Sequence, residues 1–345
     1  MALDSAPALA VDWGRVIGPL RTQVQEAVTS KQLPDLQLAF ARDRKIVWTE
    51  VFHGQANGSC GKETRFRIGS VAKCITATAL LKLVEEGRID LDRPITDYFP
   101  CDVPEANRMT ARLLAGHLAG IRHYQGKETL NTRHYESLPS GLAIFSSSPL
   151  VASPGTMFHY SSYGFNLLGC VMEAATREKF PALVDEQVLK PLGMSHTEVD
   201  DLTKGLQGLA PTYVRAKDGS VVAVNPTDDS YKWPSGGYVS TAEDLIVLGN
   251  CYLGPGFLSE ASLKAAETSQ TTLSGKPTGY SLGWFVSHNA DGTVVLSHEG
   301  EAVGGEALLF VNPAKKAVFA AVWDVSQVEI TPLLDRVGRE LAEAK

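Results

Sequence analysis

A serine and a lysine three residues apart, Ser70 and Lys73, have a spacing that could support covalent chemistry. Ser70 comes directly before the segment 71–86, in which apolar residues recur at helical spacing, and Lys73 lies near its start. Residues three apart share a helix face, so the Lys73 amine would lie beside the Ser70 hydroxyl. An amine that loses its proton in a desolvated pocket can activate a serine for nucleophilic attack. The alternative interpretation is an N-capping serine followed by a solvated lysine.

A second stretch places polar side chains in a loop that follows Pro154 and Gly155. Tyr160 and Ser162 lie there, just before a predicted helix that starts near Gly164. Such a loop can direct both side chains into a cleft, and a tyrosine beside a lysine can relay protons. Packing of aromatic residues within the lobe is the alternative interpretation of Tyr160.

A third stretch is an apolar run that ends in His298, with Gly300 two residues later. A glycine at the end of a strand permits close backbone approach of a ligand. This pattern favours a strand that borders a binding site. A structural role for His298 remains open.

The remaining pattern predicts the elements that must hold these three stretches. An amphipathic helix is expected over 11–31, a β-hairpin over 36–42 and 46–52, and a last helix over 327–344. Helices are also expected over 110–118, 167–177, 182–189 (closed by Pro191 and Gly193) and 259–268, and a further one beginning near Ser240. A hairpin over 213–224 and four apolar runs, 280–286, 293–297, 307–311 and 317–323, predict antiparallel strands.

Strands at both ends of the chain and helices in its middle predict an α+β fold. One antiparallel sheet would be flanked by the terminal helices, with a mainly helical lobe inserted. The 345 residues would form a single catalytic domain, with an α/β lobe from about 10–66 and 212–345 and a helical lobe at about 67–211.

Composition narrows the classes of partner. The net charge of −7 gives no basic surface for nucleic acid, and no apolar run approaches the ~20 residues of a membrane helix. The first twelve residues show no signal peptide, which predicts a cytoplasmic protein, or a periplasmic or secreted one if a leader has been removed. Five scattered cysteines without a Cys-x-x-Cys pair predict reduced core residues rather than a zinc knuckle or a disulfide framework.

The order of the three stretches resembles the serine β-lactamase and penicillin-binding-protein superfamily. Its S-x-x-K helix, Y-x-N or Y-x-S loop and K-T-G or H-x-G strand correspond to Ser70–Lys73, Tyr160–Ser162 and His298–Gly300. The resemblance covers nearly the whole chain. It is closest to the class C β-lactamase-like branch, which includes family VIII carboxylesterases, D-aminopeptidases, D-alanyl-D-alanine carboxypeptidases and a mitochondrial serine protease. The phrases 120–124 and 229–233 look most like the last of these.

The resemblance implies a role for each matching residue. Ser70 would be the nucleophile, Lys73 its general base, and Tyr160 the group that shares or relays a proton to the leaving group. The backbone N–H groups of Ser70 and Glu301 would form the oxyanion hole. Acylation of Ser70 followed by hydrolysis would need no metal and no organic cofactor.

The chain also departs from the superfamily pattern. His298 and Glu299 stand where the third motif usually has a lysine and a threonine that grip a substrate carboxylate, and Ser162 replaces an amide-binding asparagine. A histidine anchors an anion less well than a lysine, and a pocket-facing Glu299 would repel one. Strand alternation leaves both orientations of Glu299 open.

These departures predict a serine hydrolase that acts on carboxylic esters without a free carboxylate, a carboxylesterase-like activity. A peptidase (an endopeptidase or a D-amino-acid peptidase) and a weak β-lactamase are the enzymatic alternatives, and a catalytically silent scaffold that binds peptides or self-assembles is the alternative from another class. The substrate would be a small ester or a peptide, and the oligomeric state stays open. Residues predicted to contact substrate are Ser162, His298, Glu299, Gly300 and Trp233, with Tyr231 and the segment 125–136 as further lining.

Overall fold

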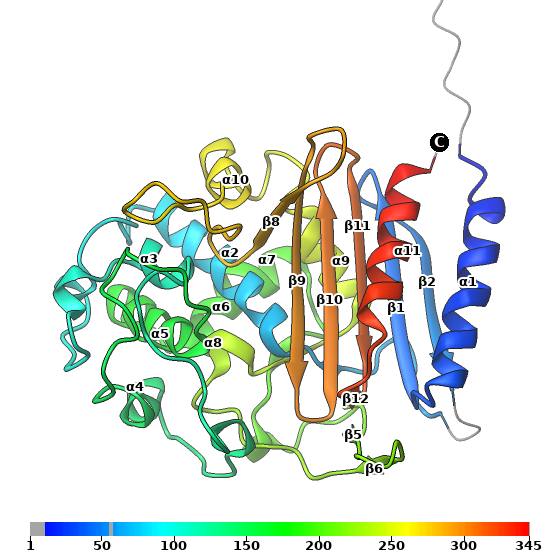
Figure 1. Cartoon of the computed structure of the whole chain (residues 1–345), viewed down its shortest axis with the longest axis horizontal. Helices are drawn as coiled ribbons and strands as arrows, with labels where there is room; N and C mark the ends of the chain where they lie inside the picture. The colour runs from blue at the N-terminus through cyan, green and yellow to red at the C-terminus, as the bar shows by residue number, and fades with distance from the viewer. Residues whose placement is uncertain (1–10, 55–57, 345) are drawn as a thin grey trace, which may run out of the picture.

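The centre of the fold is an antiparallel sheet of six strands, ordered β2-β1-β11-β10-β9-β8 (Figure 1). The computed structural model describes residues 11–54 and 58–344, so the first ten residues, on which most of the leader prediction depends, lie outside the described residues. The strands are β1 (Asp35–Arg42), β2 (Lys45–His53), β8 (Phe285–His288), β9 (Val294–Ala302), β10 (Gly305–Asn312) and β11 (Ala317–Trp323). Both ends of the chain build this sheet, as the sequence predicts.

Two terminal helices cover one face of the sheet. Figure 1 shows α1 (Trp13–Ser30) and α11 (Thr331–Glu343) on the same side of the strands. Alternation along β10 explains the two layers: Leu308 and Phe310 pack in the cluster beneath these helices, whereas Leu309 and Val311 belong to the core on the opposite face. That second core also contains α9 (Ala242–Asn250) and the helical lobe.

The inserted lobe is built around α2 (Ala72–Glu85) and α5 (Ser162–Thr176). Helix α5 begins at Ser162, close to the start predicted near Gly164 and ahead of the periodic range 167–177, because the Ser161 hydroxyl accepts a hydrogen bond from the Gly164 amide and caps the helix. The other helices are α3 (Ala111–Ala115), α4 (Leu138–Gly141), α6 (Phe180–Val184), α7 (Lys190–Leu192), α8 (Trp233–Gly236) and α10 (Glu260–Glu267).

Two predicted elements are altered. The helix expected over 182–189 is α6 followed by a π-helical turn, Asp185–Leu189, and α7, so Pro191 lies inside a helical turn and only Gly193, at φ +71°, ends it. The first strand of the predicted meander begins at Phe285 rather than at 280. The residues before it form a turn, in which the Ser281 amide donates to the Trp284 carbonyl.

Two small sheets of three strands each complete the fold. One has the order β12-β5-β6, with β12 (Val325–Ser326), β5 (Tyr213–Arg215) and β6 (Val221–Ala223); the other is β3-β7-β4, with β3 (Phe66–Arg67), β7 (Tyr238–Ser240) and β4 (Glu198–Val199). Strand β3 leads directly into Ser70. None of the helices in residues 11–54 and 58–344 has the length and apolar character needed to cross a membrane.

Candidate active site

Ser70 lies where the central sheet meets the helical lobe. It occupies a 3-10 turn, Gly69–Val71, that precedes α2. Gly69 has φ +48°, and a β-carbon there would come within 2.5 Å of the Glu301 amide nitrogen on β9. A β-carbon on Gly300 would lie 1.9 Å from the Ile68 carbonyl oxygen and 3.1 Å from the Ser70 nitrogen. The two glycines therefore let the backbones that carry the Ser70 and Glu301 amides touch.

The amine of Lys73 is placed by three oxygen atoms. Its Nζ lies 2.9 Å from Ser70 Oγ, 3.2 Å from Ser162 Oγ and 2.6 Å from the Ser235 carbonyl oxygen. A neutral amine has two N–H donors and one lone pair. When one N–H donates to the Ser235 carbonyl and the other to Ser162 Oγ, the lone pair faces Ser70 and can accept its hydroxyl proton.

The surroundings of Lys73 favour that neutral form. The side chain is fully buried, and this burial lowers the pKa of Lys73 well below its ordinary value. Cys74 opposes the shift in part, and the charge of Lys232 makes a still smaller contribution in the same direction as burial. Lys232 is itself paired with Asp229 at 2.9 Å, and this contact helps to raise the pKa of Lys232 although burial opposes it. One lysine is thus held as a cation and the other as a base.

Tyr160 covers the same site from the loop before α5. Lys73 Nζ lies 5.0 Å from the centre of its ring, and the ring stacks on Phe285 with centroids 6.3 Å apart. Burial raises the pKa of Tyr160 above its ordinary value, although a hydrogen bond with Ser70 opposes this shift. The phenol therefore stays protonated at neutral pH and can donate a proton rather than remove one.

Ser162 is joined to a residue that the sequence analysis did not select. The Ser162 amide donates to His123 Nδ1 at 3.2 Å, which makes Nδ1 an acceptor and places the proton of the neutral ring on Nε2. Burial, with a smaller effect of Lys73, lowers the pKa of His123 to about 4. His123 is therefore a neutral donor beside Tyr160, with ring centroids 5.5 Å apart.

His298 is a buried, neutral ring. Its Nδ1–H donates to the Glu299 carbonyl at 2.6 Å, since a carbonyl can only accept, so its Nε2 accepts from the Tyr280 hydroxyl at 2.9 Å. Burial lowers the pKa of His298 to about 3. This histidine cannot serve as a cation for a substrate carboxylate at neutral pH.

Of the two orientations that the sequence leaves open for Glu299, the strand register selects the one that points away from Ser70. In the register of β9 and β10, Glu299 pairs with Leu308 and Glu301 with Glu306, and Leu308 packs beneath the terminal helices. Partial burial and then the charge of Asp335 on α11 raise the pKa of Glu299, which agrees with that placement. Both carboxylates thus lie on the sheet face away from Ser70, while His298 and Gly300 face it.

These groups border a cavity of about 900 Å³. Its described lining includes most of the residues predicted for the site: Ser70, Tyr160, Ser162, His298, Glu299, Gly300 and Glu301. Gln327 and Thr331 also border the cavity. Thr129, Leu130 and Thr132 border it from the predicted segment 125–136.

Trp233 and Tyr231 do not border this cavity, contrary to expectation. The Trp233 indole N–H donates to the Asp200 carbonyl at 3.2 Å, and the Tyr231 hydroxyl donates to the Glu128 carbonyl at 3.0 Å. Through these hydrogen bonds, both aromatic side chains link separate segments of the chain. Their neighbour Lys232 borders the cavity instead.

Comparison with known proteins agrees with this geometry. A profile of the family described as Beta-lactamase matches residues 20–337, which is nearly the whole chain. The chain belongs to the beta-lactamase family. It is a serine hydrolase of the β-lactamase and penicillin-binding-protein kind.

One sequence relative and two solved structures are similar to this chain over most of its length. The mitochondrial serine beta-lactamase-like protein LACTB of Mus musculus is 26% identical over 89% of this chain and 74% of its own length. The octameric penicillin-binding protein homologue from Pyrococcus abyssi superposes with a TM-score of 0.80 at 23% identity, over 92% of this chain and 75% of that one. A D-stereospecific amidohydrolase from Streptomyces sp. gives 0.78 at 24%, over 92% and 98%. The two structures support the β-lactamase-like fold.

Proposed function

We propose that this chain hydrolyses uncharged carboxylic esters through an acyl-enzyme on Ser70. The observation that carries the proposal is the Lys73 amine, which is fully buried and lies 2.9 Å from Ser70 Oγ. A lysine on a surface would be charged and solvated, and could not act as a base at neutral pH. The burial of Lys73 is what makes the neighbouring hydroxyl a nucleophile.

The reaction follows from the donors and acceptors at the site. Ser70 Oγ attacks the ester carbonyl while its proton passes to Lys73 Nζ, and the backbone N–H groups of Ser70 and Glu301 stabilise the oxyanion. Proton transfer through the Tyr160 hydroxyl lets the alcohol leave. Water then attacks the acyl-enzyme, releases the carboxylic acid and restores the Ser70 hydroxyl.

The charges around the cavity support an uncharged substrate. Among the described residues that line the cavity, Lys232 is the one whose side chain is positively charged at neutral pH. Its ammonium group is paired with the Asp229 carboxylate at 2.9 Å. His123 and His298 are neutral, because their pKa values lie at about 4 and about 3. A substrate carboxylate would lose its hydration near Ser70 without gaining an unpaired cation.

Esters are favoured over amides by the leaving group. An alcohol needs less protonation help than an amine, and the raised pKa of Tyr160 makes its phenol a weak acid. Peptide hydrolysis is the second candidate, because the cavity of about 900 Å³ is bordered by both Leu130 of the helical lobe and Thr331 of α11, which leaves room for more than a small ester. β-Lactam hydrolysis is disfavoured, since these substrates carry a carboxylate.

A matched pair of substrates tests the proposal. Two esters of the same acyl group would differ only in a carboxylate beside the scissile bond, free in one and capped as a neutral amide in the other. We expect kcat/KM to be at least about tenfold higher for the capped member, about 1.4 kcal/mol in transition-state free energy. Equal rates, or a preference for the free carboxylate, would contradict the proposal and favour a carboxypeptidase or a β-lactamase.

We further propose that His123 Nε2–H binds a polar group of the substrate acyl chain. This donor would compensate for Ser162, whose hydroxyl reaches less far than the asparagine of the superfamily motif. His123→Phe keeps a ring beside Tyr160 but removes the donor, so we expect kcat/KM to fall about tenfold, mainly through KM. His123→Gln offers an amide donor and should recover part of the loss. His159→Phe serves as the matched control; a similar loss there, or none in His123→Phe, would argue against the assignment.

A further inference from the structure

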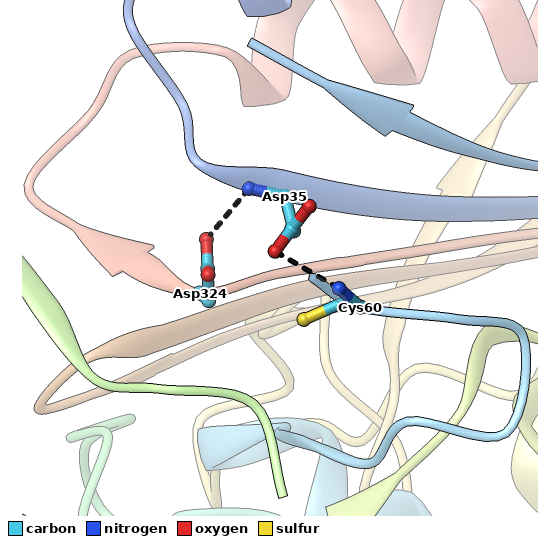
Figure 2. Close-up of side chains that lie close together, drawn as sticks. All are labelled: Asp35, Cys60 and Asp324. Atoms are coloured by element: carbon cyan, nitrogen blue, oxygen red, sulfur yellow. Dashed lines mark hydrogen bonds between the residues drawn. The ribbon is translucent and has the colours of Figure 1, made fainter. Parts of the chain in front are cut away.

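A second cluster of reactive side chains lies away from the catalytic cavity. Asp35 begins β1, Cys60 lies in the loop before β3, and Asp324 lies between β11 and β12. All three are buried, and their ligand atoms lie within 4.8 Å of one another. Figure 2 shows the thiol and the two carboxylates converging from three separate segments. None of the three lines the cavity that contains Ser70.

Neighbouring groups fix the orientation of the carboxylates. Asp35 Oδ2 accepts from the amides of Ser59 at 3.2 Å and Cys60 at 3.3 Å, and His53 Nδ1–H donates to Asp35 Oδ1. The Asp35 amide in turn donates to Asp324 Oδ1 at 3.1 Å (Figure 2). Carboxylates that bind a metal ion are themselves oriented by hydrogen bonds from neighbouring groups, as Asp35 is here.

One oxygen of the cluster has no partner. Asp324 is fully buried, and its Oδ2 is among the described side-chain atoms that are buried without a hydrogen bond. A buried carboxylate oxygen that is left unsatisfied is costly, and a second carboxylate beside it adds repulsion. Nothing in the Ser70 chemistry uses this group. A bound cation would give this oxygen the partner that it lacks.

We propose that Asp35, Cys60 and Asp324 form a binding site for a zinc ion. The thiol selects against calcium and magnesium, which prefer oxygen ligands, and favours a borderline metal such as zinc. Tetrahedral zinc with bonds of about 2.0–2.3 Å holds its ligand atoms about 3.3–3.8 Å apart, so small side-chain movements suffice. On binding, the Cys60 thiol releases its proton to solvent and a water molecule fills the fourth position.

The proposed ion would link three segments that are distant in the sequence. It would join the first strand of the sheet, the end of β11 and the loop that leads to the Ser70 segment. Because the ion binds the folded chain, it should stabilise the protein by mass action. It should leave the chemistry at Ser70 unchanged.

Cobalt and zinc binding by the whole protein test the site. We expect one equivalent of Co²⁺ to produce a thiolate-to-metal charge-transfer band, one equivalent of Zn²⁺ to displace it, and Zn²⁺ to raise the melting temperature. Cys60→Ser should remove the band and weaken zinc binding at least about tenfold, whereas the control Cys101→Ser should leave both unchanged. Asp324→Asn keeps the acceptor for the Asp35 amide but loses a charged ligand, and should also bind zinc at least about tenfold more weakly.

The outcomes are distinguishable from those of the esterase proposal. Absence of the cobalt band in the folded protein, or its persistence in Cys60→Ser, would overturn the zinc site whatever the hydrolytic activity. If Cys60→Ser fails to fold, Asp324→Asn decides: unchanged zinc affinity in that variant overturns the proposal. Hydrolysis should be the same with and without zinc, so a failure of either proposal leaves the other standing.

Discussion

Replacing Ser70 with alanine should abolish ester hydrolysis, with kcat falling by about 10⁴-fold or more. The substitution removes the oxygen that forms the acyl bond, while the Lys73 amine keeps its contacts with Ser162 and Ser235. Substrate binding should persist, so the loss should appear in kcat rather than in KM. Incubation of the wild type with a slowly released ester should add the mass of one acyl group to the protein, and Ser70→Ala should remain unmodified.

Ser30→Ala is a suitable control, because Ser30 is an exposed serine at the end of α1 whose hydroxyl donates only to the nearby Ala27 carbonyl. It should acylate and hydrolyse like the wild type. Unfolding curves of both variants would show whether a lost activity reflects lost structure. If Ser70→Ala retained the activity of the folded protein, the catalytically silent scaffold would become the better interpretation.

The Ser70–Lys73 pair could be predicted because its geometry is local. Spacing of three residues fixes neighbours on one helix face, whatever the rest of the chain does. The burial of Lys73 is not local: it depends on Ser235 at α8 and on the loop that carries Tyr160. The sequence therefore indicates which residues meet, but not that the amine is desolvated.

The orientation of Glu299 shows a different limit. Strand alternation predicts that Glu299 and His298 point to opposite faces, but the sequence does not say which face lies toward the site. Pairing with β10 decides it, because Leu308 belongs to the core beneath the terminal helices. Once that face is known, alternation places His298 toward Ser70.

His123 and Trp233 were misjudged for the same physical reason. His123 lies in an irregular segment and Trp233 begins the short helix α8, and in neither place does a periodic pattern show which side chains face a cavity. The sequence shows that a histidine stands at position 123, but its role depends on a hydrogen bond from the Ser162 amide, which belongs to another segment. The lobe boundaries at about 66 and 212 stay a prediction.

The regular strands and helices can be predicted from the sequence better than the irregular segments. Apolar runs and short turns predict the strands β10 and β11 closely, whereas β9 continues to Ala302, beyond the predicted run 293–297. The π turn at Asp185–Leu189 follows from packing rather than from any local pattern. The cluster of Asp35, Cys60 and Asp324 is also invisible to spacing rules, because its members come together only when both ends of the chain enter the sheet.

Replacing Lys73 with methionine should lower kcat/KM by about 10²–10⁴-fold, the usual contribution of a general base. The pH profile gives the sharper expectation. Because burial lowers the pKa of Lys73, the amine becomes neutral at a pH well below 10.5, its ordinary value. Wild-type kcat/KM should therefore rise with pH through a single ionisation and reach a plateau. Below that ionisation the amine is protonated, cannot accept the Ser70 proton, and activity is lost.

The same variant should be more stable than the wild type at neutral pH. In the wild type, the unfolded chain binds the Lys73 proton more tightly than the folded chain, so the cost of burying this lysine is greatest below the folded pKa. It disappears as the pH rises toward the unfolded value. Methionine fills similar space without a charge and removes this cost, so urea unfolding should shift to higher concentrations.

Lys82→Met, on the same helix but at the surface, should change neither the pH profile nor the stability in this direction. A stable Lys73→Met with full activity, or a wild-type profile that is flat across the neutral range, would exclude Lys73 as the base. Loss of activity together with a gain in stability would instead show that holding a neutral amine beside Ser70 lowers the free energy of unfolding of the wild type.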